Sequence, residues 1–551
     1  MVGAALLQRV AVVAVLVGSL LVVVALDARR VERGRALRRR LILGVPWGTL
    51  VTVAGVLGVY LFVQGGARAW NAPATIPFRA WSFLYPLGVV TAPFAHAGPG
   101  HLLGNLTGTL AFAPLVEYAV GHYPRERGRQ SFGSLRENPY ARALLVPAAA
   151  VVVGLVTGVF SVGPVIGFSG VVFAFAGCAL VVFPLRTVVA LAGARALSLL
   201  TAAVRSPVTV ARAEPSFASP WWADIAIQGH ALGLLAGVLV GLWLSRRGVV
   251  GRPSALRTWA GVLLFGVGQS LWAVYWFRGG GTFVLYRAAG LALVAVLAAL
   301  VAATTVASAR PLVGSGPAGE SLRSLPRWQV GAVVLVVVLS ALAGPGAAVN
   351  LATTSDDPLP GDPLTVRDYE VTYAEDVENG MVSVVDVEAF GETTSVNTSG
   401  VVVRSRERHA WVTAVSKSRL AFAGRTVVRV GGVGWLERVV VERRGWNVVG
   451  GNSTYRVTFA HAGTSRVVYR SPPARASPTI DGRNVSIRAA PPGFRVAVSR
   501  DNRTRTVPMP AENTTATAFG LRFTRDGRQL VASRDDTRVV VARQEVRPGA
   551  G

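Results

Sequence analysis

The chain has 551 residues, of which 51% are hydrophobic and only 15% are charged, and its formal net charge at pH 7 is +27. Up to residue 349 the apolar residues are gathered into runs of about 18 or more, long enough to cross a hydrocarbon core of about 30 Å as helices. This composition excludes an ordinary soluble protein. The single cysteine, Cys178, excludes a disulfide framework and a cysteine-based metal site within one chain.

The positive charge is almost entirely arginine, since Lys417 is the only lysine. Up to residue 349 the arginines are concentrated in short loops at 27–40, 122–142, 246–257 and 310–327. Arginine-rich short loops are typical of the cytoplasmic side of a membrane protein, so they set the expected orientation. No basic patch is interleaved with exposed aromatic residues, and we therefore expect no nucleic-acid partner.

In chain order, the apolar runs predict ten membrane-spanning helices. The first run ends in an arginine block and has no cleavage site, so we interpret residues 1–40 as a retained anchor and a basic cytoplasmic loop. A loop rich in Trp, Phe and Pro at 65–95 is amphipathic enough to lie in the membrane interface. The expected helices are 5–26, 42–63, 100–120, 142–162, 168–185, 187–204, 225–245, 256–277, 286–307 and 329–349.

The chain changes character at residue 350. Segments such as MVSVVDVEAF, RTVVRVGG and TRVVVARQ are rich in β-branched residues and are bounded by turn formers. This predicts an all-β region at 350–551, either one sandwich-like domain or a pair of small β-domains. The tenth helix leads away from the cytoplasm, so we expect this domain to be extracytoplasmic and to form an independent module. Five N-x-S/T acceptor patterns agree with that side of the membrane: Asn397, Asn452, Asn484, Asn502 and Asn513.

One serine stands between glycines at the head of an apolar run, in the sequence GFSG at 167–170. Ser169 is either an ordinary helix start or a nucleophile that works inside the membrane. Acyl transfer by serine needs a base, donors for the oxyanion, and water. His230, near the start of a later apolar run, is the candidate base, because an ionisable residue there is costly to bury and commonly functional. The alternative is a histidine that only bonds a neighbouring helix.

Small residues accompany both candidates at helical spacing. His230 shares a helix face with glycines at i+3, i+7 and i+11, which are Gly233, Gly237 and Gly241. The serine run offers a matching face in Gly170, Ala174 and Gly177. Small residues on facing sides let two helix backbones approach closely. Such a contact would bring Ser169 and His230 together at one depth.

A second polar group lies in HAGPGHLLGN. His101 and Asn105 are spaced i, i+4 and share a face at the start of the third helix, and His96 precedes them in a Gly/Pro loop. A neutral imidazole and a carboxamide can both donate hydrogen bonds without adding formal charge, as an oxyanion site with the Ser169 N–H requires. The alternative interpretation is a polar cluster at a helix start.

Three motifs in this order resemble the rhomboid family of intramembrane serine proteases over about residues 42–247: H-x4-H-x3-N at 96–105, G-x-S-G at 167–170 and G-H-x2-G-x3-G at 229–237. The resemblance implies a six-helix core with a catalytic dyad of Ser169 and His230. It also implies an oxyanion and substrate-binding site of His101, Asn105, His96 and Gly167, transmembrane protein substrates, and no cofactor.

The resemblance is incomplete at a few positions. Phe173 matches the aromatic residue that packs on the histidine in many members, whereas Gly229 stands where many have alanine. The adjacent Trp-Arg pair that many members carry in the first loop is missing; Arg68, Trp70, Arg79 and Trp81 are separate here. Asp224 is not expected to complete a triad.

We therefore expect a multi-pass protein of the cell membrane that cleaves transmembrane segments near their outer face. Its parts are the anchor and basic loop (1–40), the protease core (41–247), three further helices (248–349) and the β-rich domain (350–551). The loop 205–224 is a candidate lateral gate. Two alternatives are an inactive rhomboid-like scaffold, which typically loses the serine or the histidine, and a transporter with a proton path, for which the helices offer only Glu117. No sequence feature indicates an oligomeric state.

Overall fold

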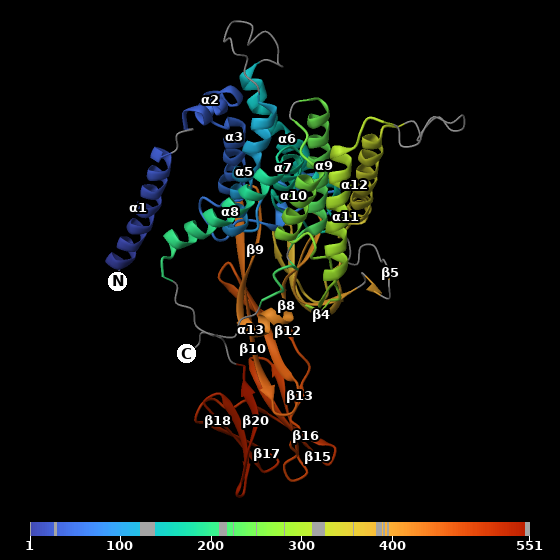
Figure 1. The fold of residues 1–551 in the computed structure, drawn as a ribbon. Helices are drawn as coiled ribbons and strands as arrows, with labels where there is room; N and C mark the ends of the chain where they lie inside the picture. The colour runs from blue at the N-terminus through green and yellow to red at the C-terminus, as the bar shows by residue number, and fades with distance from the viewer. Residues whose placement is uncertain are drawn as a thin grey trace, which may run out of the picture.

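The computed structural model is a helical bundle that stands on an elongated β-rich domain (Figure 1). It describes residues 2–26, 30–121, 138–208, 218–223, 225–248, 251–279, 281–310, 325–355, 358–381, 388–389, 392–393 and 396–545. Five of the described helices are long and apolar enough to cross a membrane: Pro139–Phe160, Pro184–Arg205, Ile227–Arg246, Arg287–Val306 and Arg327–Ala352. Shorter apolar helical segments are Leu6–Ser19, Trp47–Val63, Ser169–Val182 and Ala255–Gly268. The chain is thus a multi-pass membrane protein.

The helices that carry the sequence motifs form the centre of the bundle. They are α3 (Trp47–Gly58), which continues as a π-helical turn over Val59–Val63, then α5 (Pro99–Val120), α6 (Pro139–Phe160), α7 (Ser169–Val182), α8 (Pro184–Arg205) and α9 (Ile227–Arg246). Helix α7 is buried at every residue after Ser169. Its 14 residues span about 21 Å at about 1.5 Å per residue, less than a hydrocarbon core of about 30 Å. A helix of this length is too short to reach both faces of the hydrocarbon core.

The remaining helices surround this centre. They are α1 (Val2–Leu26), α2 (Arg30–Arg40), α10 (Ala255–Gly268), α11 (Arg287–Val306) and α12 (Arg327–Ala352). Helix α12 packs on α6, α9 and α11, and α10 packs on α8 and α11. The short elements are η1 (Ile42–Gly44), η3 (Ile76–Phe78) and α4 (Pro86–Thr91).

Each of the ten expected spans contains a helix, but two boundaries were wrong. The helix expected at 256–277 ends at Gly268, and the aromatic segment that follows forms a hairpin of β1 (Tyr275–Phe277) and β2 (Phe283–Leu285). Gly279 and Gly281, both with positive φ, make its turn possible, and Tyr, Trp and Phe favour strands. The basic segment 30–40, expected as loop, is helix α2.

The β-rich domain is confirmed, and its strands pair among themselves. One antiparallel sheet has the order β3-β4-β7-β8, formed by Leu364–Val366, Tyr369–Glu378, Asn397–Ser405 and Ala410–Ser416. The short helix α13 (Lys417–Ala423) follows it. Of the expected strand MVSVVDVEAF at 381–390, residues 382–387 and 390 lie outside the described residues, and 388–389 form β5 (Glu388–Ala389), which pairs with β6 (Glu392–Thr393).

A second, larger sheet runs the length of the domain. Its order is β12-β11-β10-β20-β19-β18-β17, and β9 also pairs with β10. Strands β9 to β12 are Arg425–Gly432, Trp435–Val448, Ser453–His461 and Thr464–Arg470. Strands β17 to β20 are Thr515–Ala518, Leu521–Asp526, Gln529–Arg534 and Thr537–Gln544. A third sheet, β13 to β16, comprises Ala474–Arg475, Asn484–Ala490, Gly493–Arg500 and Arg503–Pro508. The long strand β10 takes part in both hydrophobic cores of the domain, through Val439 and Val441 in one and Trp446 and Val448 in the other.

The β-rich domain packs against the helical part of the chain, a contact that the sequence does not predict. Ile76 and Trp81, from the loop between α3 and α5, belong to the same buried cluster as Val371, Val403 and other β-domain residues. The indole Nε1 of Trp81 donates a hydrogen bond to the Arg408 carbonyl at 2.9 Å. Residues distant in sequence thus complete one core, a pairing that periodicity cannot reveal.

Candidate active site

A strained turn delivers Ser169 to the start of α7. Gly167 has φ +131°, a region that favours glycine, and a Cβ there would lie 2.4 Å from His101 Cε1. Its N–H donates to the Ala92 carbonyl at 2.9 Å, and the Val165 carbonyl accepts from the Ala80 N–H at 3.1 Å. The turn 161–168 is thereby tied to the loop 64–98, and no residue other than glycine fits at 167.

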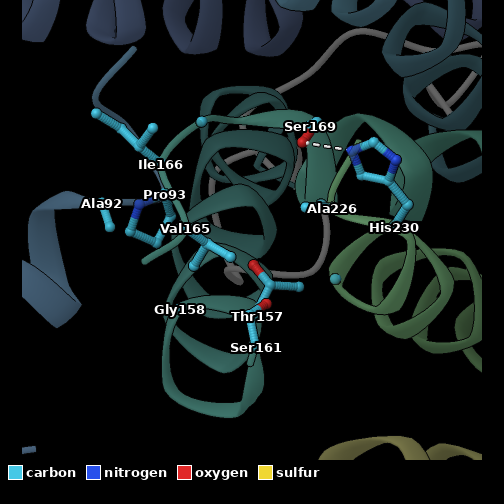
Figure 2. A pocket seen from close by; sticks show the side chains of 13 residues that line it. Ala92, Pro93, Thr157, Gly158, Ser161, Val165, Ile166, Ser169, Ala226 and His230 are labelled. Atoms are coloured by element: carbon cyan, nitrogen blue, oxygen red, sulfur yellow. Dashed lines mark hydrogen bonds between the residues drawn. The ribbon is translucent and has the colours of Figure 1, made fainter. Parts of the chain in front are cut away.

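Ser169 and His230 are in hydrogen-bond contact, with 2.8 Å between Ser169 Oγ and His230 Nε2 (Figure 2). The Phe173 ring stacks on the His230 ring, with centroids 4.2 Å apart and planes 11° from parallel. A serine hydroxyl that donates to Nε2 requires the neutral imidazole to carry its proton on Nδ1. Among the described residues Nδ1 of His230 is buried without a hydrogen-bond partner. Asp224 lies outside the described residues.

The predicted close contact between the two small-residue faces is confirmed. A Cβ on Gly233 would lie 2.0 Å from the Gly170 carbonyl oxygen, and one on Gly237 would lie 1.9 Å from the Ala174 carbonyl oxygen. From the other side, a Cβ on Gly177 would lie 2.1 Å from the Leu234 carbonyl oxygen. Real Cβ atoms essentially never come this close, so any side chain would push α7 and α9 apart. The glycines hold the two helices at the separation that joins Ser169 to His230.

The second polar group lies beside the first. Asn105 Nδ2 is 3.0 Å from His96 Nε2, and the rings of His96 and His101 meet edge to face at 5.2 Å. His101 in turn lies against Gly167, two residues before Ser169. The six expected site residues therefore occupy one continuous region, in which His96 holds Asn105 and His101 lies against the serine turn.

Gln64 supports this region and was missed by sequence reasoning. Its Oε1 accepts from the His96 N–H at 2.7 Å, and its Nε2 donates to the carbonyls of His96 and Ala74 at 2.9 and 2.8 Å. The side chain is 2% exposed. The only sequence signal is a lone amide at the end of the second apolar run, which does not identify a distant partner.

A small cavity reaches the two catalytic candidates (Figure 2). Its walls come from four places: the α4–α5 connection at Ala92 and Pro93, the end of α6 at Thr157 and Ser161, the turn before Ser169 at Val165 and Ile166, and the first turn of α9 at Ala226 and Gly229. Hydroxyl oxygens of Thr157 and Ser161 thus stand among small apolar side chains, a lining that suits a site for a peptide backbone and a water molecule.

Glu117 has a structural position that bears on the transporter alternative. Its carboxylate accepts from the backbone N–H groups of Gly48 and Thr49 at 3.0 and 2.9 Å, and from Thr49 Oγ1 at 2.8 Å. It thus caps the first turn of α3, where helix amides lack partners. Arg40 donates to the Gly121 carbonyl just beyond it, at the end of α5 away from Ser169. Glu117 is a helix cap far from the histidines.

In the loop 64–98, Arg79 and Trp81 contact different parts of the structure. Arg79 NH1 donates to the Pro164 carbonyl at 2.8 Å, next to the serine turn, while Trp81 contacts the β-rich domain. Of the candidate gate 205–224, residues 209–217 and Asp224 lie outside the described residues.

Comparison with known proteins finds a family match for one part of the chain. Residues 77–247 match the family model described as the Rhomboid domain. No curated protein and no solved structure matches the chain. The matched range contains all six candidate site residues and ends just after α9, so α10 to α12 and the β-rich domain lie outside it.

The α7–α9 contact predicts the effect of a single added side chain. Gly237→Val must displace α9 from the Ala174 carbonyl, which separates Ser169 from His230 and costs about 1–3 kcal/mol or more in stability. Gly193→Val, on the exposed face of α8 with no atom within 4 Å of an added Cβ, is the matched control. We expect Gly237→Val to lower the melting temperature and to abolish labelling of Ser169 by a fluorophosphonate. Equal labelling of both variants would contradict the role of the contact.

Proposed function

Because residues 77–247 place this chain in the rhomboid family, we propose that it is an intramembrane serine endopeptidase that cleaves transmembrane segments of other membrane proteins. The observation that carries the proposal is the 2.8 Å contact between Ser169 Oγ and His230 Nε2 inside a bundle of apolar helices. An inactive scaffold would not need both groups in that geometry.

The geometry supports a two-step acyl transfer. As Ser169 Oγ attacks the scissile carbonyl, His230 Nε2 takes the hydroxyl proton, and it then gives this proton to the leaving amine. Water, deprotonated by the same nitrogen, hydrolyses the acyl-enzyme and releases the serine. Stacking on Phe173 restricts rotation of the imidazole, which replaces part of the orientation that a third catalytic residue would supply.

Candidate donors for the oxyanion lie beside the turn that carries Ser169. The Ser169 N–H belongs to the first turn of α7, where helix amides have no acceptor in their own helix. His101, against Gly167, and Asn105, held by His96, supply side-chain N–H groups in the same region. We assign His101 and Asn105 as oxyanion donors and His96 as a positioning residue.

We also propose that the β-rich domain is extracytoplasmic in a cell membrane and that cleavage occurs near the outer face. The arginine-rich helix α2 lies at the end of the bundle away from the β-rich domain (Figure 1). Arg246 at the end of α9 contacts Thr304 of α11 and Trp328 at the start of α12, opposite the end of α12 that leads into the β-rich domain, as the positive-inside rule expects of cytoplasmic segments. Ser169 lies toward the opposite end, since the turn before it contacts Asn350 at the end of α12 through the Ser161 carbonyl.

Removal of either catalytic group tests the proposed reaction. We expect Ser169→Ala and His230→Ala each to abolish cleavage of a model transmembrane substrate, and the double variant to be no worse than either, because the two groups act as a unit. Ser198→Ala, whose exposed hydroxyl donates to the Ala194 carbonyl within α8, is the control and should retain activity. Cleavage by purified Ser169→Ala protein would refute the assignment of the nucleophile.

Loss of one oxyanion donor should lower the rate less than loss of Ser169 or His230. We expect His101→Ala and Asn105→Ala each to lower kcat by about 10²–10³, the usual cost of losing one such donor. His96→Ala should resemble Asn105→Ala, because it releases the Asn105 amide. Thr107→Val, on the same helix, is the control. If kcat is unchanged in all three variants, the oxyanion is stabilised elsewhere.

The orientation can be tested with single cysteines, because the chain has only Cys178, which is buried. In a Cys178→Ala background we expect a membrane-impermeant maleimide to label Thr464→Cys in intact cells and Ser308→Cys only after the membrane is opened. Both positions are exposed, one in the β-rich domain and one just after α11. The reverse pattern would invert the topology.

A further inference from the structure

A second, larger cavity lies between α9, α11 and α12. Its volume is about 600 Å³, within the range of about 300–1,000 Å³ typical of ligand sites. Its walls are mainly apolar, and the side chains that form them include Leu235, Leu271, Val294, Leu297, Val338 and Leu342. We refer to it as the α9/α11 cavity.

The polar side chains in its wall are already engaged. Gln228 Nε2 donates to the carbonyls of Phe160 and Leu342 at 2.8 and 2.7 Å, and its Oε1 accepts from the Val162 N–H at 3.1 Å. The Tyr275 hydroxyl donates to the Ala223 carbonyl. These bonds fix the wall where α6, α9 and α12 meet, and they leave the cavity suited to an apolar occupant.

The α9/α11 cavity adjoins the active site. Val165, Ala226 and Gly229 line both this cavity and the small cavity at Ser169. Gly229 directly precedes His230, so the two cavities lie at the same depth in the bundle. The cavity also reaches the lipid-facing surface, because Leu293 lines it and is 60% exposed. A substrate arriving from the membrane can therefore occupy both cavities at once.

We propose that the α9/α11 cavity binds large apolar side chains of the substrate's transmembrane segment beside the scissile bond and so sets substrate specificity. This inference rests on the proposed protease function. The occupant follows from three features: walls without a free charge, access from the lipid side, and continuity with the cavity at Ser169. Helices α11 and α12 lie outside residues 77–247, so this specificity element belongs to the additional helices of this chain.

Filling the cavity tests its role in specificity. Val338→Trp and Leu297→Trp add an indole to its wall, while Val337→Trp and Val296→Trp place the same group on neighbouring positions that are 60% and 65% exposed. The substrates are one model transmembrane segment with alanine near the scissile bond and a series in which leucine or phenylalanine replaces alanine, one position at a time.

We expect the wild type to prefer the large side chain at one or more positions. The two filling variants should lower kcat/KM for those substrates about tenfold or more, as loss of a hydrophobic subsite does, and leave the alanine substrate within about twofold. The control variants should match the wild type. An equal loss on all substrates, or no loss on any, would overturn the proposal.

A binding measurement keeps this inference separate from the protease assignment. In Ser169→Ala protein, a photoreactive benzoylphenylalanine at position 338 should cross-link to the model segment, and one at position 337 should not. Cross-linking at neither position, or at both alike, would overturn the proposal. So would a co-purified lipid that Val338→Trp displaces while substrate preference stays unchanged. If the cross-link forms but the wild type neither cleaves nor reacts with a fluorophosphonate, the cavity still binds clients and the protease function fails.

Discussion

The site depends on how closely the backbones of α7 and α9 approach. At glycines 177, 233 and 237 the backbone of one helix lies directly against a carbonyl group of the other. A methyl group at any of these positions would overlap that carbonyl oxygen. In lipid there is no hydrophobic drive for helices to associate, so such close packing is what holds them together. Because Ser169 begins α7 and His230 lies in the first turn of α9, the same packing that stabilises the bundle also sets the distance between the two groups.

That contact could be predicted from the sequence because it is periodic. Glycines at i+3, i+7 and i+11 from His230 mark one face of one helix, and Gly170, Ala174 and Gly177 mark the face it meets. The helices themselves could be predicted for the same reason, since length and apolarity are local properties. The stacking of Phe173 on His230 came only from the family resemblance.

Other features could not be predicted, because they depend on partners far away in the sequence. Trp81 is buried against Arg408, more than 300 residues later, and nothing in the local sequence of either residue indicates the other. Gln64 holds His96 through backbone atoms, which leave no pattern of residue types. The first strand of the hairpin, 275–277, falls inside the helix expected at 256–277 because its aromatic residues extend an apolar run, and hydropathy does not distinguish a strand from the last turn of a helix.

The loop 64–98 links the β-rich domain to the active site. On one side, the Arg408 guanidinium donates to Asp368 at 2.6 Å and to the Tyr85 hydroxyl at 2.8 Å. Burial alone would lower the pKa of Arg408, but its hydrogen bond to the Asp368 carboxylate raises the pKa above its ordinary value, so this partly buried guanidinium stays charged. This ion pair lies within the β-rich domain and holds the guanidinium that donates to Tyr85 of the loop; removing either partner would leave an unpaired charge.

On its other side, the same loop contacts the groups that surround Ser169. Arg79 and Ala80 donate to the carbonyls of Pro164 and Val165 in the turn before the serine, and the loop ends at His96, which holds Asn105. The loop 64–98 thus contacts both the core of the β-rich domain, through Trp81, and the backbone of Pro164 and Val165 before the serine. Trp81 of the loop is buried by residues of the β-rich domain, so the domain contributes to the packing of the loop itself. The domain also continues directly from α12, whose Asn350 donates to the Ser161 carbonyl, so it is joined to the turn before Ser169 through both the loop and this helix.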